Sequence, residues 1–337
     1  MADTDAGSSY IALATGRPHV TSRATVLAPR AALVFTGFLR DTCHHGLGRP
    51  NMTTGVHALR EQLMWCMQAF SGQCDVFIHT WITTQKAAPF RMHGAALNDS
   101  SLPGPNLTSV QANSSVHDIA LSWKCVEVLQ LALSATAVAI EAQAVPSHAQ
   151  MASVRPWGAM RENLLNMRMQ VASAIGGLQL MRRHATAMGV TYHAAVRMRA
   201  DIGASTWQTS RKGWFLNAAG YRTMRRRADL YAKKQLPSTK SDELVLCGHP
   251  RYKHTDFCNW SVPPDPLVRT MEMLTGEAFD QVIYGGEGCE AYLTNNATDG
   301  VGRPMHIPAV SENVLYCAMR AGGVRPSSLV DTKAGVS

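Results

Sequence analysis

Residues 190–201 read VTYHAAVRMRAD and follow the longest helical pattern in the chain. Their β-branched and aromatic content predicts a strand, in which alternate side chains face the same way. Arg197, Arg199 and Asp201 would then project from one face, and the apolar residues between them would pack on the other. Ligands of open α/β sheets bind at the carboxyl ends of the strands, so this stretch predicts a pyrophosphate site. The alternative is an edge strand with a solvated charged face.

Two apolar runs upstream predict further buried strands, at residues 31–35 and 75–81. Between them, residues 56–70 have the periodicity of an amphipathic helix. A strand, a helix and a strand within about fifty residues form a βαβ unit, which implies a parallel sheet. A third strand is expected at residues 137–140.

Each of the first two predicted strands ends in residues suited to a ligand. Gly37 follows the first strand, where a glycine permits close backbone approach, and Arg40 is placed to reach a phosphate. The second strand ends at His79 and Trp81. The favoured interpretation of His79 is a structural histidine rather than a base.

A long amphipathic helix is expected to begin at Pro156 and end before Gly189, at a C′ position. Its methionine-rich apolar stripe predicts core packing. The Gly176-Gly177 pair is expected to kink or split it. A last helix is predicted to begin at Ser311.

The chain has a net charge of +8 and a pI near 9.2, which favours an anionic partner. Only 7% of its residues are aromatic, and these do not interleave with the basic runs, which argues against nucleic-acid binding. The segment from Trp207 to about Leu236 contains the basic runs 225–227 and 233–234 and is predicted to be irregular and solvated.

Eight cysteines permit disulfides without requiring them. Six Asn-x-Ser/Thr sequons indicate a secretory-pathway lumen, that is, the Golgi or endoplasmic reticulum; they begin at Asn51, Asn98, Asn106, Asn113, Asn259 and Asn296. No signal peptide or anchor is evident, so a complete chain would instead be cytoplasmic, and membrane association would need an anchor missing from this sequence. The spacing of the side chains Cys247, His249, His254 and Cys258 also resembles that of zinc ligands. We rank a zinc site low because Cys-x-His leaves fewer residues between the two ligands than the usual zinc motifs do.

These patterns predict one α/β domain at residues 30–325, with a mostly parallel central sheet flanked by helices. Residues 1–29 are expected to be a poorly ordered lead-in, 85–115 a loop or insertion, and 326–337 a tail.

The order of the motifs resembles a group of glycosyltransferase-like proteins of surface and cell-wall polysaccharide synthesis. The matching segments are TGFLR at 36–40, DVFIHTW at 75–81, VRMRAD at 196–201 and a late Ser-Glu-x-x-Leu at 311–315. The family counterparts read roughly Ser-Gly-x-x-Arg, Asp-Val-Phe-x-His-Thr-Trp and Arg-x-Arg-x-Asp. The resemblance implies a GT-A-like, Rossmann-type sandwich that binds a nucleotide sugar.

The resemblance also assigns roles. Gly37, Arg40, His79 and Trp81 would contact the nucleotide sugar, together with Arg197, Arg199 and Asp201. Asp201 takes the place of a metal-binding Asp-x-Asp, but Arg199 stands where the first carboxylate would be. Mn²⁺ or Mg²⁺ is therefore an open expectation, with arginine as the alternative neutralising group. Asp256 and Glu312 are the candidate catalytic bases.

The predicted reaction is transfer of a sugar from a nucleotide sugar to a hydroxyl group of a glycan or glycoconjugate. The leaving diphosphate needs neutralisation, and an inverting enzyme needs a carboxylate to deprotonate the acceptor. Two alternatives stay open: a catalytically silent member of the same fold that binds a glycan or partner, and, ranked lower, a sulfotransferase. The latter would need a lysine that the turn after the first strand lacks.

Overall fold

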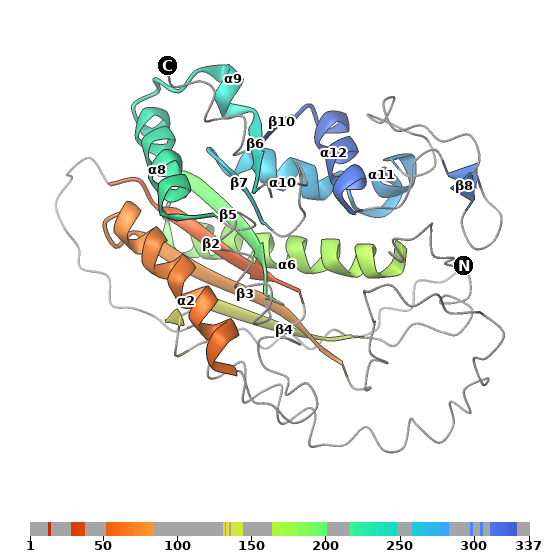
Figure 1. Ribbon diagram of the computed structural model, residues 1–337, viewed down its shortest axis with the longest axis horizontal. Coiled ribbons are helices and arrows are strands. Elements are labelled where there is room, and N and C mark those ends of the chain that lie inside the picture. The colour runs from red at the N-terminus through yellow and green to blue at the C-terminus, as the bar shows by residue number, and fades with distance from the viewer. Residues whose placement is uncertain are drawn as a thin grey trace.

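The computed structural model describes residues 13–14, 28–37, 52–83, 131, 133–134, 136–143, 164–200, 216–247, 258–282, 297–298, 304–305 and 311–328. These form an α/β fold built on an eight-stranded mixed sheet with helices on both faces (Figure 1). The predicted α/β class is confirmed. The predicted insertion at 85–115 lies outside the described residues.

The first strands follow the predicted βαβ pattern. Strand β2 (Ala31–Thr36) leads into α2 (Met52–Ala69) and then β3 (Cys74–Thr83), which pairs with β2 in parallel. Strand β4 (Ala137–Gln143) continues the parallel set on the far side of β3, and the two-residue β1 (Leu13–Ala14) pairs with it in antiparallel fashion. The predicted lead-in thus supplies one short edge strand.

The chain then returns to the other side of β2. Helix α6 (Leu164–Met188) crosses the sheet, and β5 (Ala194–Arg199) pairs with β2 in parallel. The strand order β4-β3-β2-β5 therefore reverses between β2 and β5. In doubly wound sheets, such a reversal is the topological switch point where ligands bind.

The remaining strands complete the sheet beyond β5. Strand β7 (Cys258–Ser261) is antiparallel to both of its neighbours, β5 and β6 (Glu243–Leu246), and β10 (Arg325–Ser328) pairs with β6 in parallel. Strand β10 extends the sheet past the predicted end of the domain at residue 325. The small strands β8 (Ala297–Thr298) and β9 (Pro304–Met305) form a separate pair.

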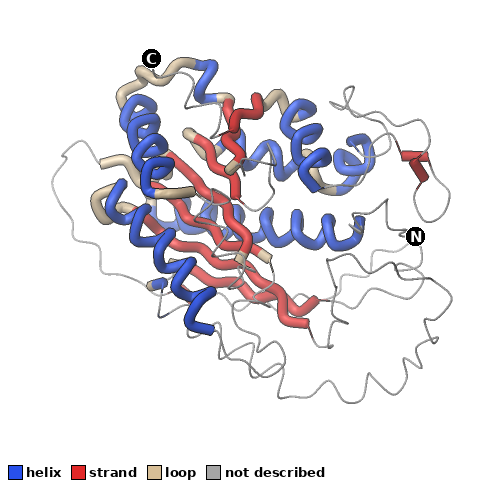
Figure 2. The backbone as a smooth tube through the Cα atoms, in the orientation of Figure 1, coloured by secondary structure: helices blue, strands red, loops and turns tan. Residues whose placement is uncertain are grey.

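Two apolar clusters, one on each face of the sheet, hold the layers together. Helices α2 and α8 (Ala218–Ala232) cover one face (Figure 1). Helices α6, α10 (Asp265–Glu272) and α12 (Ser311–Ala321) pack on the other. The short helices α9 (Ser238–Ser241) and α11 (Gly276–Asp280) connect neighbouring elements. Figure 2 shows the strands lying between these helices.

Helix α8 corrects the prediction of an irregular, solvated segment between Trp207 and Leu236. The Asn217 side chain accepts a hydrogen bond from the Gly220 N–H and caps the helix. Tyr221, Met224 and Ala228 recur at helical spacing and are fully buried. The apolar pattern of these buried residues was not recognised in the sequence because the arginine run makes the helix polar on average.

Helix α6 corrects a second prediction, since it runs through Gly176-Gly177 without a break. A Cβ atom on Gly176 would lie 2.2 Å from Nε2 of His79, and one on Gly177 would lie 2.6 Å from Cγ1 of Val34. The two glycines therefore bring the helix close to the sheet. Gly189 ends the helix with a φ of +61°, as predicted for a C′ residue.

The cysteines among the described residues are all in disulfides. Cys66 pairs with Cys74, Cys247 pairs with Cys258, and Cys317 is also disulfide-bonded. Cys247 and Cys258 therefore do not supply thiolates to zinc, and His249 and His254 lie outside the described residues.

The sequon at Asn259 lies on a central strand. Asn259 is fully buried, and neither its Oδ1 nor its Nδ2 finds a hydrogen-bond partner within the described parts of the chain. We predict that a peptide containing Asn259 carries no glycan after expression in glycosylating cells, because a glycan there would displace β7. Peptide mass spectrometry after enzymatic deglycosylation in heavy-oxygen water measures this, and an occupied Asn259 in folded protein would contradict the strand assignment.

Candidate functional site

The candidate site lies at the carboxyl ends of β3, β2 and β5, on the face covered by α6. His79 pairs with Thr36, and Thr36 pairs with Arg199 across the other edge of β2, so the three residues form one row over three parallel strands. Adjacent strands lie about 4.8 Å apart, which brings these side chains close together. This row borders the switch point between β2 and β5.

Arg197 and Arg199 project toward α6, as the alternation of the strand predicted. Their exposed fractions are only 4% and 9%, and β5 lies between β2 and β7. The alternative of an edge strand with a solvated charged face is therefore wrong. On the opposite face, Val196, Met198 and Ala200 join the apolar cluster beneath α2 and α8.

Thr36 connects the two central strands of the site. Its Oγ1 accepts a hydrogen bond from Nε of Arg197 at 3.1 Å and lies 3.5 Å from the carbonyl oxygen of Met198. The Ala200 N–H donates to the Thr36 carbonyl at 2.8 Å, which continues the pairing past the end of β5. These contacts hold the Arg197 side chain against the end of β2 and keep Ala200 hydrogen-bonded beside β2 after β5 ends.

Ser173 of α6 connects the turn after β2, at Gly37, to β3. Its Oγ accepts from the Gly37 N–H at 2.7 Å, donates to the His79 carbonyl at 3.1 Å and lies 3.1 Å from His79 Nδ1. Gly37 adopts a φ of +98°, which glycine tolerates without strain. Because its N–H is engaged by Ser173, Gly37 shapes the turn and its N–H is not available to a phosphate.

His79 is 1% exposed, and its ring lies against Gly176. This placement agrees with the interpretation of His79 as a structural histidine that is packed between the sheet and α6. The backbone of Trp81 lies in β3 opposite Glu141, and its side chain is outside the described residues.

Four further predicted site residues are not placed with their side chains. Arg40, Asp201 and Asp256 lie outside the described residues. Glu312 lies in the first turn of α12, and its side chain is not described. The structure therefore brings together Gly37, His79, Arg197 and Arg199, with Thr36 and Ser173 as additions that the sequence did not single out.

The described side chains of this row offer guanidinium, hydroxyl and imidazole groups. This donor set suits an anion, because arginine presents a planar fork to phosphate oxygens. It does not suit Mn²⁺ or Mg²⁺, which prefer carboxylate and other oxygen ligands. The described part of the chain contains no cluster of three or more His, Cys, Asp or Glu side chains placed to hold a metal.

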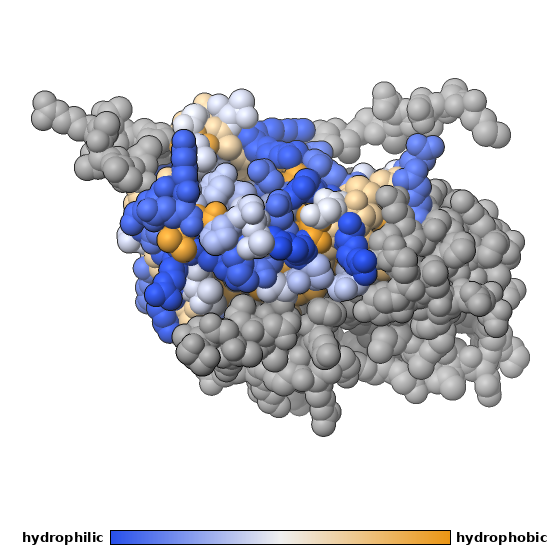
Figure 3. Space-filling model, turned by 90° about the horizontal axis from the view of Figure 1, so that it is seen from above, coloured by the Kyte–Doolittle hydropathy of each residue, from blue (hydrophilic) through white to orange (hydrophobic). Residues whose placement is uncertain are grey.

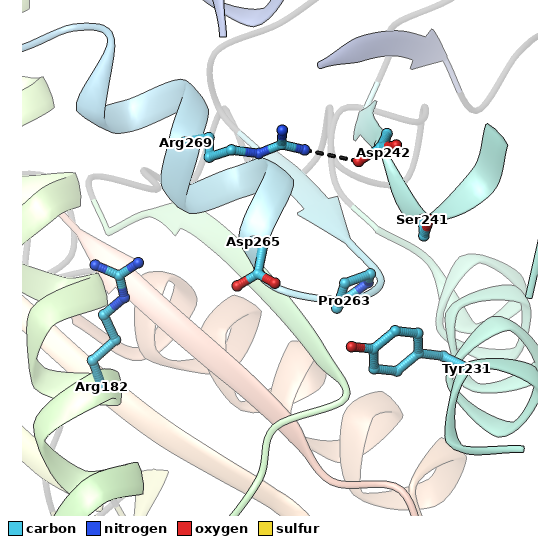
Figure 4. A pocket seen from close by; sticks show the side chains of 7 residues that line it. All are labelled: Arg182, Tyr231, Ser241, Asp242, Pro263, Asp265 and Arg269. Carbon is cyan, nitrogen blue, oxygen red and sulfur yellow. Dashed lines mark hydrogen bonds and ion pairs between the residues drawn. The ribbon is translucent and has the colours of Figure 1, made fainter. Parts of the chain in front are cut away.

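A shallow depression of about 500 Å³ lies at the opposite, amino-terminal edge of the parallel strands (Figure 4). Arg269 points toward Asp242 there and forms an ion pair at 2.9 Å, and Asp265, Arg182 and Tyr231 also line it. Opposite charges are mixed in this depression. Ligands of open α/β folds bind at the carboxyl ends of the strands, so this depression lies at the edge opposite to the expected ligand site.

The same amino-terminal edge holds a network that fixes the starts of β3 and β5. The Tyr192 hydroxyl donates to Asp75 at 2.7 Å and lies 2.9 Å from Nδ1 of His184, and Arg30 forms an ion pair with Asp75 at 3.0 Å. Burial, followed by the Asp75 charge, raises the pKa of Tyr192. The phenol therefore stays protonated and serves as a donor.

His193 makes stability depend on pH at this edge. Burial, followed by the Arg225 charge, lowers the pKa of His193, whose Nδ1 accepts from the Arg30 N–H at 3.3 Å. The unfolded chain therefore binds this proton at a higher pH than the folded protein, and stability should fall as pH drops below about 6.5. Urea denaturation between about pH 7 and pH 5 measures the free energy of unfolding, which should fall less steeply with decreasing pH in His193→Gln than in the wild type. An equal dependence on pH in both proteins would contradict this assignment.

No family model, curated protein or solved structure matches this chain. Within the described residues, no helix is both long enough and apolar enough to cross a membrane.

Proposed function

We propose that the chain is a nucleotide-sugar-dependent glycosyltransferase that holds the donor diphosphate at the switch point between β2 and β5. The observation that carries this proposal is the burial of Arg197 and Arg199 on a central strand beside that point. An arginine stays charged in a protein, and its planar fork of N–H donors matches the oxygens of a phosphate. A diphosphate entering at the strand ends has the charge and geometry that such a fork binds.

The two arginines would contribute differently. Arg199 lies at the last residue of β5, nearest to the strand ends, and is the main candidate for direct contact with the diphosphate. Arg197 lies two residues deeper and bonds Thr36, so it would contribute its charge and hold the end of β2 in place. Charge developing on the leaving diphosphate would be stabilised by these preorganised groups.

The strand order supports a nucleotide-binding fold. With β2 counted first, the order β4-β3-β2-β5 corresponds to 3-2-1-4, the order that begins the doubly wound dinucleotide-binding sheet. A GT-A-like sandwich is the finer assignment that we propose from this order and from the resemblance of the motifs. Asp256 and Glu312 remain the proposed acceptor-side bases, and Asp201 the proposed contact to the donor sugar.

The cysteines support a secretory-pathway lumen as the compartment. Disulfides persist in oxidising compartments and are rare in the cytosol. The five cysteines among the described residues are all disulfide-bonded, and five sequons remain after Asn259 is excluded as buried. We propose the Golgi or endoplasmic reticulum lumen on this basis.

A screen of nucleotide sugars tests the activity. Purified protein is incubated with UDP-, GDP-, ADP- and CMP-linked sugars, with and without Mn²⁺, and release of the free nucleotide is measured. We expect hydrolysis or transfer with one nucleotide class. Donor binding without turnover, across acceptors that include glycans, would favour the catalytically silent alternative. Absence of both binding and turnover would contradict the proposal.

A further inference from the structure

The outer face of α8 carries a row of cations that the candidate site does not use. Arg222 and Arg226 are exposed and lie four residues apart on one side of the helix, and the exposed C-cap residue Lys233 follows on the same side seven residues later. We name these three residues the α8 stripe. The inner side of the helix, which includes Tyr221 and Met224, is buried against the sheet and α2. The stripe extends for about 16 Å along the helix axis.

The neighbouring arginines are neutralised, which distinguishes the stripe from them. Arg225 pairs with Asp229 at 3.0 Å, and Arg227 pairs with Glu243 at 2.6 Å and stacks over the Trp260 ring. The residues of the stripe form no salt bridge with any acidic side chain in the described parts of the protein. Lys234 adds a further exposed cation beside its end. Seen from above, the described residues present a largely hydrophilic surface with a few apolar side chains among them (Figure 3).

The stripe lies on the amino-terminal side of the sheet, away from the candidate site. The Tyr231 ring, near the carboxyl end of α8, lies 6.4 Å from the ring of His193, which immediately precedes β5. Nη1 of Arg225 donates to the carbonyl of Ala69, and its guanidinium lies over the Phe70 ring, just before β3 begins. An extended anion lying along α8 would meet the three cations in turn.

We propose that the α8 stripe binds an anionic polysaccharide, a chain whose sugars carry carboxylate or sulfate groups. Spaced point charges along a straight helix suit a polymer with charges at intervals along its length. The large exposed apolar residues of the described chain, Met64, Leu131 and Met188, lie outside α8. The helix thus lacks the apolar face that insertion into a bilayer requires. Its exposed side also lacks the aromatic platforms used for single-stranded nucleic acids.

The stripe binds the polyanion whether or not the chain is a transferase. A further role, in which this polysaccharide is the acceptor, rests on the proposed function. It requires the polymer to continue from the amino-terminal side of the sheet to the edge where the donor diphosphate is held.

Binding to immobilised heparin and to polygalacturonate tests the proposal, with neutral dextran as the uncharged control. The variant Arg222→Ser/Arg226→Ser/Lys233→Ser should bind both polyanions about tenfold or more weakly. The matched variant Arg182→Gln/Arg183→Gln/Arg320→Gln removes the same charge from α6 and α12 and should bind as the wild type does. Binding should also weaken as salt is raised.

Several outcomes would overturn the proposal. These are binding to dextran with equal strength, unchanged polyanion binding in the α8 variant, or an equal loss in the matched variant. Tighter binding to phosphatidylserine vesicles or to single-stranded DNA, lost in the α8 variant, would assign the stripe to another partner and also overturn it. A nucleoside diphosphate melting assay on the same proteins separates the two proposals. If the protein binds polyanions but no nucleoside diphosphate raises its melting temperature, the transferase proposal and the acceptor role are contradicted. The proposal that the α8 stripe binds a polyanion is then still supported.

Discussion

Replacement of Arg199 by glutamine is expected to weaken nucleoside diphosphate binding by about 100-fold, because charge-assisted hydrogen bonds to phosphate contribute roughly 1.5–3 kcal/mol. The substitution removes the guanidinium at the strand end nearest to the switch point. Isothermal titration of the folded variant with the diphosphate that stabilises the wild type measures this loss.

Two comparisons give this prediction its controls. Arg199→Lys keeps the positive charge but loses the planar fork, so its affinity should fall between those of the wild type and the glutamine variant. Arg226→Gln removes the same charge from the exposed side of α8 and should bind the diphosphate normally. Equal affinities for Arg199→Gln and the wild type would remove Arg199 from the site.

Replacement of Gly176 by alanine is expected to destabilise the protein by about 2 kcal/mol or more, although alanine is the better helix former by about 1 kcal/mol. The added Cβ would lie 2.2 Å from the ring of His79, which is buried beneath α6. Helix and sheet would have to separate to relieve the contact. Urea denaturation measures the change in the free energy of unfolding.

The opposite substitution in the same helix is the matched control. Ala172 lies on the exposed side of α6, and Ala172→Gly should cost about 1 kcal/mol through helix propensity alone. In a double-mutant cycle, His79→Ala should relieve much of the cost of Gly176→Ala, since the two sites are in contact. A more stable Gly176→Ala protein would contradict the close approach of α6 to the sheet.

Periodicity predicted the elements with strong apolar patterns. Strands β2, β3 and β5 and helices α2 and α6 were recognisable because their buried residues recur at the spacing of their secondary structure. The alternation of β5 also placed Arg197 and Arg199 on one face. The burial of both arginines was not predictable, because local spacing does not show whether a strand is central or at an edge.

Other features depend on contacts between distant segments. Helix α8 was missed because arginines outnumber its few buried apolar residues, and β7 was missed because its sequence, Cys258 to Ser261, is short and polar. Ser173 lies within the apolar pattern of α6, where a serine gives no sign of bonding to Gly37. The Gly176-Gly177 pair was read as a kink because only the packed structure shows the neighbouring His79.

The most direct test of a diphosphate site at the β2–β5 switch point is the melting temperature of the purified protein with UDP, GDP, ADP and CMP, each with and without Mn²⁺. A ligand that binds only the folded state raises the melting temperature by mass action. We predict that at least one of these nucleotides raises it in the wild type and fails to do so in Arg199→Gln. No shift with any nucleotide in the wild type, or an undiminished shift in Arg199→Gln, would contradict the account.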